Sequence, residues 1–175
     1  MQGRTRRVVG RTVGVAAVTL CTAVVPVAAV VFTGSSKSNR VRGTNGADKI
    51  FLGAGNDRAA GRGGADRIVG ARGRDRLNGG TGRDRLSGGS GADRLVAGKG
   101  KDRLVSGSGN DRLAGGSGND VLGGNSGADL MKGLGGRDRL TGGKGRDRIS
   151  GGGGNDRLNS VDGLRDRRVA GGPGA

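Results

Sequence analysis

The sequence has almost none of the residues that build an ordinary hydrophobic core. Among its 175 residues there is no Trp, Tyr or His, and Phe occurs only at Phe32 and Phe51. Glycine supplies 43 residues, and glycine loses more conformational freedom on folding than any other residue. Such a composition is typical either of a disordered chain or of a fold that requires glycine at fixed positions.

The sequence also lacks the side chains that most enzymes use. It contains no His, Glu or Tyr, so its Ser and Thr hydroxyls lack the His that most often activates such nucleophiles, and we expect no enzymatic activity. The shortage of aromatic side chains leaves nothing for nucleic-acid bases to stack on, so we expect no sequence-specific nucleic-acid binding. The lone Cys21 can form no internal disulfide.

Negative charge is scarce in the sequence, and a single residue type supplies all of it. The chain has 31 Lys and Arg residues against 15 acidic residues, giving a formal net charge of +16, and all the acidic residues are Asp. Random surface charge would use both Asp and Glu. The exclusive use of Asp indicates a geometric requirement for a short carboxylate.

The amino terminus has the layout of a secretory signal, in which a basic start precedes an apolar run and small residues. The basic start contains Arg4, Arg6, Arg7 and Arg11. An uncharged, mostly apolar run extends from Val13 to Phe32 and is followed by "TGSSKS". We expect residues 1–33 to be an apolar helical signal peptide, cleaved after Ala29 or Ala23, and the protein to be secreted, with the cell surface as a further destination.

The alternative for this segment is a retained membrane anchor, because about 20 apolar residues are long enough to span a bilayer. Pro26 and the many Ala and Thr residues favour the signal peptide. If the segment is not cleaved, we expect contact with a membrane only through it.

The rest of the chain is a repeat with a period of nine. Two residues before each periodic Asp is a Gly, and two residues after it is an apolar residue, from Gly46 and Ile50 to Gly154 and Leu158. The periodic residues are Asp48, Asp57, Asp66, Asp75, Asp84, Asp93, Asp102, Asp111, Asp120, Asp129, Asp138, Asp147 and Asp156. Chance cannot keep three positions in phase over such a length.

Five copies contain a complete six-residue phrase: "GGTGRD", "GGSGAD", "GGSGND", "GGKGRD" and "GGGGND". These copies resemble the hemolysin-type calcium-binding repeat, also called repeats-in-toxin (RTX), with the consensus G-G-x-G-x-D-x-U-x. The resemblance covers residues 43–160. It implies an all-β, right-handed parallel β-roll (a β-solenoid) with two repeats per coil, in which each six-residue turn leads into a three-residue strand. It also implies that Ca²⁺ lies between successive turns, held by Asp side chains from both.

Elementary strand geometry supports this interpretation, because successive side chains of a strand point to opposite faces. The apolar residue of each repeat then points inward while its neighbours point outward. Odd repeats would stack Ile50, Ile68, Leu86, Leu104, Leu122, Leu140 and Leu158 on one wall. Even repeats would stack Ala59, Leu77, Leu95, Leu113, Met131 and Ile149 on the other.

The turns suit a hard cation. Ca²⁺ takes six to eight oxygen ligands, including carboxylates and backbone carbonyls, and glycine-rich turns present both. We therefore expect several Ca²⁺ ions, with all thirteen periodic Asp residues as ligands. Arg follows most of these residues, and a guanidinium beside a carboxylate competes with a cation. Asp–Arg pairs in place of ions at some turns remain the alternative.

The division of the chain follows from the repeat. We expect residues 34–42 to be a linker, residues 43–160 to be the β-roll, and residues 161–175 to be a cap or tail in which Val161, Leu164 and Val169 cover the last coil. We expect an exported calcium-binding protein with a structural or adhesive role. One alternative is a cell-surface protein whose stacked Arg rows bind an extracellular polyanion such as teichoic acid, polysaccharide or DNA. A remote alternative is a disordered Arg/Gly-rich protein that binds nucleic acid.

Overall fold

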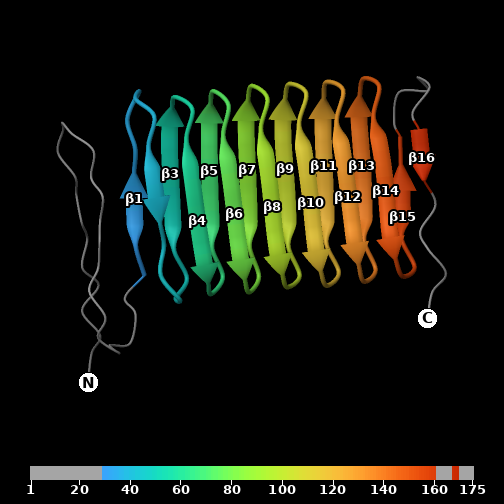
Figure 1. Cartoon of the computed structure of the whole chain (residues 1–175), viewed down its shortest axis with the longest axis horizontal. Coiled ribbons are helices and arrows are strands. Elements are labelled where there is room, and N and C mark those ends of the chain that lie inside the picture. The colour runs from blue at the N-terminus through green and yellow to red at the C-terminus, as the bar shows by residue number, and fades with distance from the viewer. Residues whose placement is uncertain (1–28, 161–166, 170–175) are drawn as a thin grey trace.

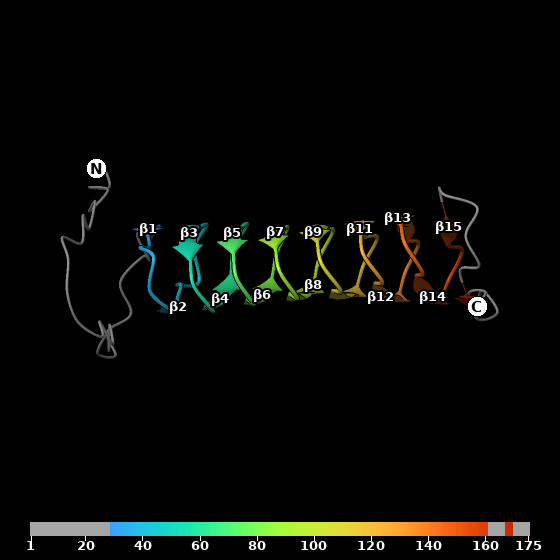
Figure 2. The same ribbon diagram turned by 90° about the horizontal axis from the view of Figure 1, so that it is seen from above.

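A computed structural model describes residues 29–160 and the backbone of residues 167–169. Within these residues the chain is a parallel β-solenoid that contains strands and no helix. Its coils stack side by side along a nearly straight axis (Figures 1 and 2). The predicted all-β fold is therefore confirmed.

Two parallel sheets of eight strands form the two faces of the solenoid. One sheet contains β1 (Val31–Thr33), β3 (Lys49–Ala54), β5 (Arg67–Arg72), β7 (Arg85–Ser90), β9 (Arg103–Ser108), β11 (Val121–Ser126), β13 (Arg139–Lys144) and β15 (Arg157–Asn159). The other contains β2 (Arg40–Arg42), β4 (Arg58–Gly63), β6 (Arg76–Thr81), β8 (Arg94–Lys99), β10 (Arg112–Ser117), β12 (Leu130–Gly135), β14 (Arg148–Gly153) and β16 (Arg167–Val169).

The register confirms that two nonapeptides make one coil. Each residue pairs with the one eighteen positions along the chain, as in Leu86 with Leu104 and Leu77 with Leu95. The two predicted apolar walls therefore face each other as one core, in which Ile50, Leu95 and Met131 are fully buried. Phe32 and Leu158 pack against the core at its two ends.

The strands are longer than the three residues that the resemblance implied. Each full strand has six residues and includes the first three residues of the following glycine-rich phrase. Its fifth residue commonly has a positive φ, as in Gly116 (118°) and Gly152 (99°), which glycine adopts without steric cost. The backbone continues to pair beyond this residue because the coils on either side follow the same path.

Strand pairing begins before the first repeat. β1 and β2 lie within the residues that the sequence assigns to the leader and linker, and they pair with β3 and β4. The expected N-terminal helix spans residues 1–33, of which residues 1–28 lie outside the described residues and Val31–Thr33 form strand β1 instead of helix. No helix among the described residues is long and apolar enough to cross a membrane.

The register changes by one residue at the other end. β16 pairs with β14 so that Arg168 stands opposite Ile149, nineteen positions away. Of the expected cap residues, Val169 lies in β16, and Val161 and Leu164 fall outside the described residues. The strand backbone therefore continues past the last regular repeat, although the apolar pattern does not.

Candidate metal centre

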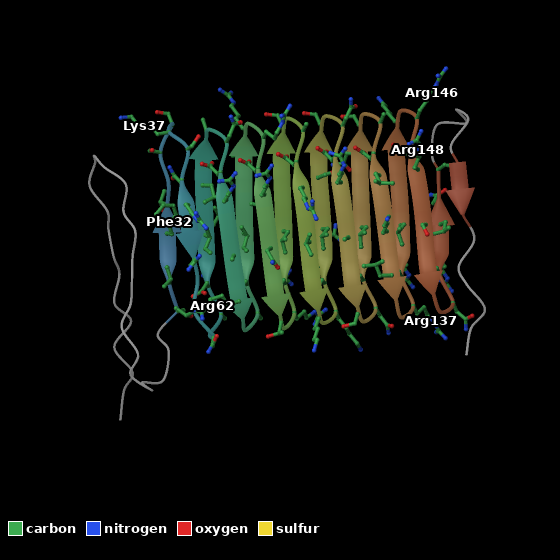
Figure 3. All side chains as sticks on the ribbon, in the orientation of Figure 1. Phe32, Lys37, Arg62, Arg137, Arg146 and Arg148 are labelled. Carbon is green, nitrogen blue, oxygen red and sulfur yellow. The ribbon has the colours of Figure 1, made fainter. Side chains whose placement is uncertain are left out.

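The periodic Asp residues form two columns along the solenoid, one at each edge where the turns lie. Figure 3 labels residues at both edges. Lys37 and Arg146 lie at one edge of the solenoid, and Arg62 and Arg137 lie at the other. The column beside Arg62 and Arg137 contains Asp48, Asp66, Asp84, Asp102, Asp120, Asp138 and Asp156. The column beside Lys37 and Arg146 contains Asp57, Asp75, Asp93, Asp111, Asp129 and Asp147. The structure thus brings all the predicted site residues into two rows.

The carboxylates point inward, which the sequence interpretation missed. The side chains from Asp48 to Asp147 are at most 2% exposed, and only Asp156, in the last coil, is half-buried. The signal was present in the sequence, because each Asp stands two positions before a core residue. Residues two apart in a strand lie on the same face.

One oxygen of each carboxylate completes the backbone hydrogen-bond ladder. The amide of Asp48 donates to Oδ1 of Asp66 at 2.8 Å, and that of Asp66 donates to Oδ1 of Asp84 at 2.8 Å. The other column repeats this arrangement, as in the 2.7 Å bond from the amide of Asp93 to Oδ1 of Asp111. The Asp side chain therefore acts as an acceptor between successive coils even without a metal.

The second oxygen of most of these carboxylates is buried and accepts no hydrogen bond. These Oδ2 atoms belong to Asp57, Asp66, Asp75, Asp84, Asp93, Asp102, Asp111, Asp120, Asp129, Asp138 and Asp156. A buried charged oxygen without a partner is costly to a fold. Its repetition along two columns indicates that another species is needed to balance these oxygens.

The electrostatics of the columns point the same way. Burial raises the pKa of Asp75, Asp93 and Asp129 from 3.8 to about 6. The carboxylates one coil away add to this rise, because like charges repel. For the same reasons, the pKa is also raised to about 6 at Asp66, Asp84 and Asp120. The columns favour a proton or another cation over ionised, unpaired carboxylates.

A small space beside Oδ2 in most repeats explains the first glycine of the repeat. A Cβ added to Gly115 would lie 2.5 Å from Oδ2 of Asp120 and 2.8 Å from the carbonyl oxygen of Gly133 in the next coil. The same pair of oxygens borders Gly61, Gly70, Gly79, Gly88, Gly124 and Gly133. The glycine therefore leaves open a space bordered by a carboxylate oxygen and a carbonyl oxygen.

The third glycine of the repeat is required by stacking. At Gly118, φ is 128°, and an added Cβ would collide with the carbonyl oxygen of Gly100 in the preceding coil. Only glycine lets the turns approach so closely. This close approach brings the oxygens of neighbouring turns together.

The donor set fits a hard divalent cation such as Ca²⁺. It consists of carboxylate and carbonyl oxygens, which are the ligands Ca²⁺ prefers. Among the described residues, no group of three or more His, Cys, Asp or Glu side chains is placed to hold a metal. Any ion must therefore draw on backbone carbonyls as well as Asp, as the spaces beside the first glycines allow.

The turns are not equivalent. Oδ2 of Asp48 already accepts hydrogen bonds from the amide (2.6 Å) and hydroxyl (3.3 Å) of Thr44. In three other repeats a side chain takes the place of the first glycine: Leu52 before Asp57, Ala97 before Asp102, and Ser106 before Asp111. All three are fully buried. These substitutions fill the space beside Oδ2 that the glycine repeats leave open.

The Arg residues beside the Asp residues point away from them. Arg76, for example, is exposed, whereas Asp75 is fully buried on the opposite face of the chain. The Oδ2 atom of Asp75 accepts no hydrogen bond from any guanidinium. The geometry at this turn therefore offers the Asp no neutralisation by its neighbour, contrary to the alternative of Asp–Arg pairs.

Comparison with known proteins agrees with this geometry. The family model "RTX calcium-binding nonapeptide repeat (4 copies)" matches residues 33–68, 60–95, 87–122, 96–131 and 123–158. No curated protein matches the chain. Because the matched segments run from residue 33 to residue 158 and cover well over half of the chain, this protein belongs to the RTX calcium-binding nonapeptide repeat family.

Proposed function

We propose that this protein is an exported, non-catalytic calcium-binding protein whose ions stabilise the solenoid, and that its role is structural or adhesive. The observation that carries the proposal is the double column of buried Oδ2 atoms without hydrogen-bond donors. In seven of the repeats that keep the first glycine, from Asp66 to Asp138, this oxygen lies beside a carbonyl oxygen of the next coil, as at Asp120 and Gly133.

The residues of the chain have separate roles in this proposal. Bound Ca²⁺ would supply positive charge and accept oxygen ligands at the turns. Oδ1 of each Asp fixes the carboxylate by accepting the amide of the preceding coil, as Asp138 does for Asp120 at 2.8 Å. Oδ2 is then the free ligand, and the first glycine keeps its surroundings open. Ions that bind only the folded chain stabilise it by mass action.

Circular dichroism of the full chain during a calcium titration tests this proposal, with magnesium as the control. The full chain is needed because β1 and β2 precede the repeats. We expect the β signal to rise with calcium and to rise much less with magnesium, which demands a smaller octahedral site. An unchanged disordered spectrum at millimolar calcium would refute the proposal and favour the disordered Arg/Gly-rich alternative.

Export rests on the amino-terminal pattern and needs its own test. The basic residues before the apolar run Val13–Phe32 support a secretory signal. We expect expression in a bacterial host to release a product that begins at Val30 or at Val24, as N-terminal sequencing would show. An intact chain retained in the membrane fraction would support the anchor instead.

A second candidate function is polyanion binding at the cell surface. The observation that favours it is the pairing of exposed Arg residues across neighbouring strands, as in Arg76 with Arg94. Stacked guanidinium groups form a continuous positive row. Such a row attracts polyanions, including cell-wall polymers.

A further inference from the structure

The solenoid separates its charges completely between inside and outside. Within residues 29–160, every acidic residue belongs to one of the two inward columns. Every Lys and Arg in the same range is exposed. The described surface therefore presents positive charge, and the half-buried Asp156 is the one acidic side chain of the described residues that reaches it.

Both faces of the solenoid carry an ordered row of this charge: Lys49, Arg67, Arg85 and Arg103 pair in register on one sheet, and the longer row, made of Arg alone, lies on the other. Arg40, Arg58, Arg76, Arg94 and Arg112 occupy the same position of β2, β4, β6, β8 and β10 and pair in register. Neighbouring strands lie about 4.8 Å apart, so unscreened neighbours in the row repel one another by about 1 kcal/mol even in water. The row ends at Leu130, which replaces Arg in β12.

The surface beside this row is open. The neighbouring outward position of β4, β6, β8 and β10 carries Ala60, Asn78, Val96 and Ala114, all small or medium in size. Because the coils stack along a nearly straight axis (Figure 2), the row is nearly straight as well. A single extended polymer could lie beside the row with its anionic groups against successive guanidiniums.

The chemistry of this face favours an acidic polysaccharide over a nucleic acid. Both Phe residues of the chain, Phe32 and Phe51, lie on the other sheet, in β1 and β3. Without aromatic side chains, bases have no platform for stacking. A linear polysaccharide with a carboxylate on each sugar needs no such platform, and each carboxylate matches the forked donors of one Arg.

The row and the Asp columns are close enough to influence each other. Arg94 directly follows Asp93, so their charges are separated only by the lengths of the two side chains, well within the Debye length of about 30 Å at 0.01 M ionic strength. The positive shell therefore opposes cations entering the columns. A polyanion on the shell would reduce this opposition, and calcium that orders the coils would align the row for the polyanion.

We propose that the Arg row of β2, β4, β6, β8 and β10 binds an extended carboxylated polysaccharide, and that this binding and calcium binding strengthen each other. The inference rests on the proposed calcium function. Linkage requires that each ligand raise the affinity for the other by the same factor.

The test uses the full chain and short oligoglucuronates as the probe, with free calcium measured by an electrode. At low ionic strength we expect the oligosaccharide to lower the calcium midpoint by about fivefold. The effect should disappear at about 1 M salt, where the Debye length is about 3 Å. In chelator, we expect oligosaccharide binding to be lost.

A pair of variants separates the row from net charge. The row variant carries Arg58→Gln, Arg76→Gln, Arg94→Gln and Arg112→Gln. The control removes the same charge from exposed positions in and beside the turns, with Arg72→Gln, Arg74→Gln, Arg83→Gln and Arg146→Gln. We expect only the row variant to lose oligosaccharide binding and the shift in calcium midpoint.

Several outcomes would overturn the inference. Equal losses in the two variants would show attraction by net charge alone. Oligosaccharide binding that ignores calcium would remove the coupling, and tighter binding of single-stranded DNA by the same row would make nucleic acid the partner. The calcium-induced β signal measured without oligosaccharide reports on the proposed calcium function separately.

Discussion

The backbone amide of Asp102 donates a 2.9 Å hydrogen bond to Oδ1 of Asp120, one coil further along the chain. The other oxygen of Asp120, Oδ2, is buried and accepts no hydrogen bond. One carboxylate therefore has two different tasks, and substitutions can separate them.

Asn and Ala at position 120 should behave differently. Asp120→Asn keeps an Oδ1 acceptor for the Asp102 amide and removes a buried charge, so in chelator we expect unfolding to become harder by about 1 kcal/mol. Asp120→Ala also leaves the Asp102 amide without its acceptor, which costs about 1–3 kcal/mol. Urea unfolding measures both values. In calcium, both variants should have a lower free energy of unfolding than the parent. An Asn variant that was more stable than the parent in calcium would contradict the proposal that Oδ2 is a calcium ligand.

The metal-free solenoid should become more stable on mild acidification. Burial and neighbouring carboxylates raise the pKa of Asp84 and Asp120 in the folded state to about 6, whereas the ordinary value is 3.8. Between these values the folded chain binds more protons than the unfolded chain, so the free energy of unfolding rises as pH falls from about 6 to about 4. This gain in the free energy of unfolding is lost as pH rises through about 6.

The β signal in chelator, compared at pH 4.5 and pH 7, would measure this effect, because it reports the folded fraction of a chain that is only partly folded without calcium. Calcium should show the opposite trend, because protons compete for the same oxygens. We expect the calcium midpoint to be higher at pH 5 than at pH 7. A metal-free chain that loses β signal on acidification would contradict the raised pKa values.

The first glycine of the repeat should control ion binding. Gly115→Ala places a Cβ 2.5 Å from Oδ2 of Asp120 and 2.8 Å from the carbonyl oxygen of Gly133. We expect this variant to bind less calcium and to be less stable by about 1–3 kcal/mol because of overpacking. Isothermal titration calorimetry gives the stoichiometry, and urea unfolding gives the stability.

The chain also offers a matched variant that should increase calcium binding instead of reducing it. Ala97 occupies the equivalent place before Asp102, whose Oδ2 also accepts no hydrogen bond. Ala97→Gly should open that space and raise the amount of calcium bound. If neither variant changed the stoichiometry, the space beside the first glycine would not be the ion site.

The second glycine of the repeat offers a route to higher stability. Leu134 has a φ of 84° and a side chain that is 48% exposed, and it pairs with Gly116 and Gly152 in the neighbouring coils. A left-handed conformation costs a non-glycine residue about 1–2 kcal/mol, of which the flexibility of glycine in the unfolded chain offsets about 0.5–1 kcal/mol. Leu134→Gly should therefore stabilise the calcium-loaded solenoid by roughly 0.5–1 kcal/mol in urea unfolding. Leu134→Ala, which retains the strained backbone, is the control and should give no such gain.

The sequence by itself determined the register of the solenoid. A period of nine that never slips from Asp48 to Asp156, together with the two repeats per coil that the RTX resemblance implies, predicted which residues stack in the two apolar walls, and the two Asp columns follow from the same register. β1 and β2 could not, because the positions in phase with the periodic Asp hold Val30 and Asn39 instead. Their strands form by pairing with β3 and β4.

Only the tertiary structure decided what each atom of the site does. The assignment of Oδ1 to an amide and of Oδ2 to an open space depends on atoms eighteen residues apart, and stacking alone sets those distances. The same holds for Asp48, whose Oδ2 accepts a hydrogen bond from Thr44. It also holds for Ala97, which stands before Asp102 at the position where Gly115 leaves a space open beside Asp120. Local sequence specifies the phase of a repeat, whereas contacts between coils specify which oxygens are left to bind an ion.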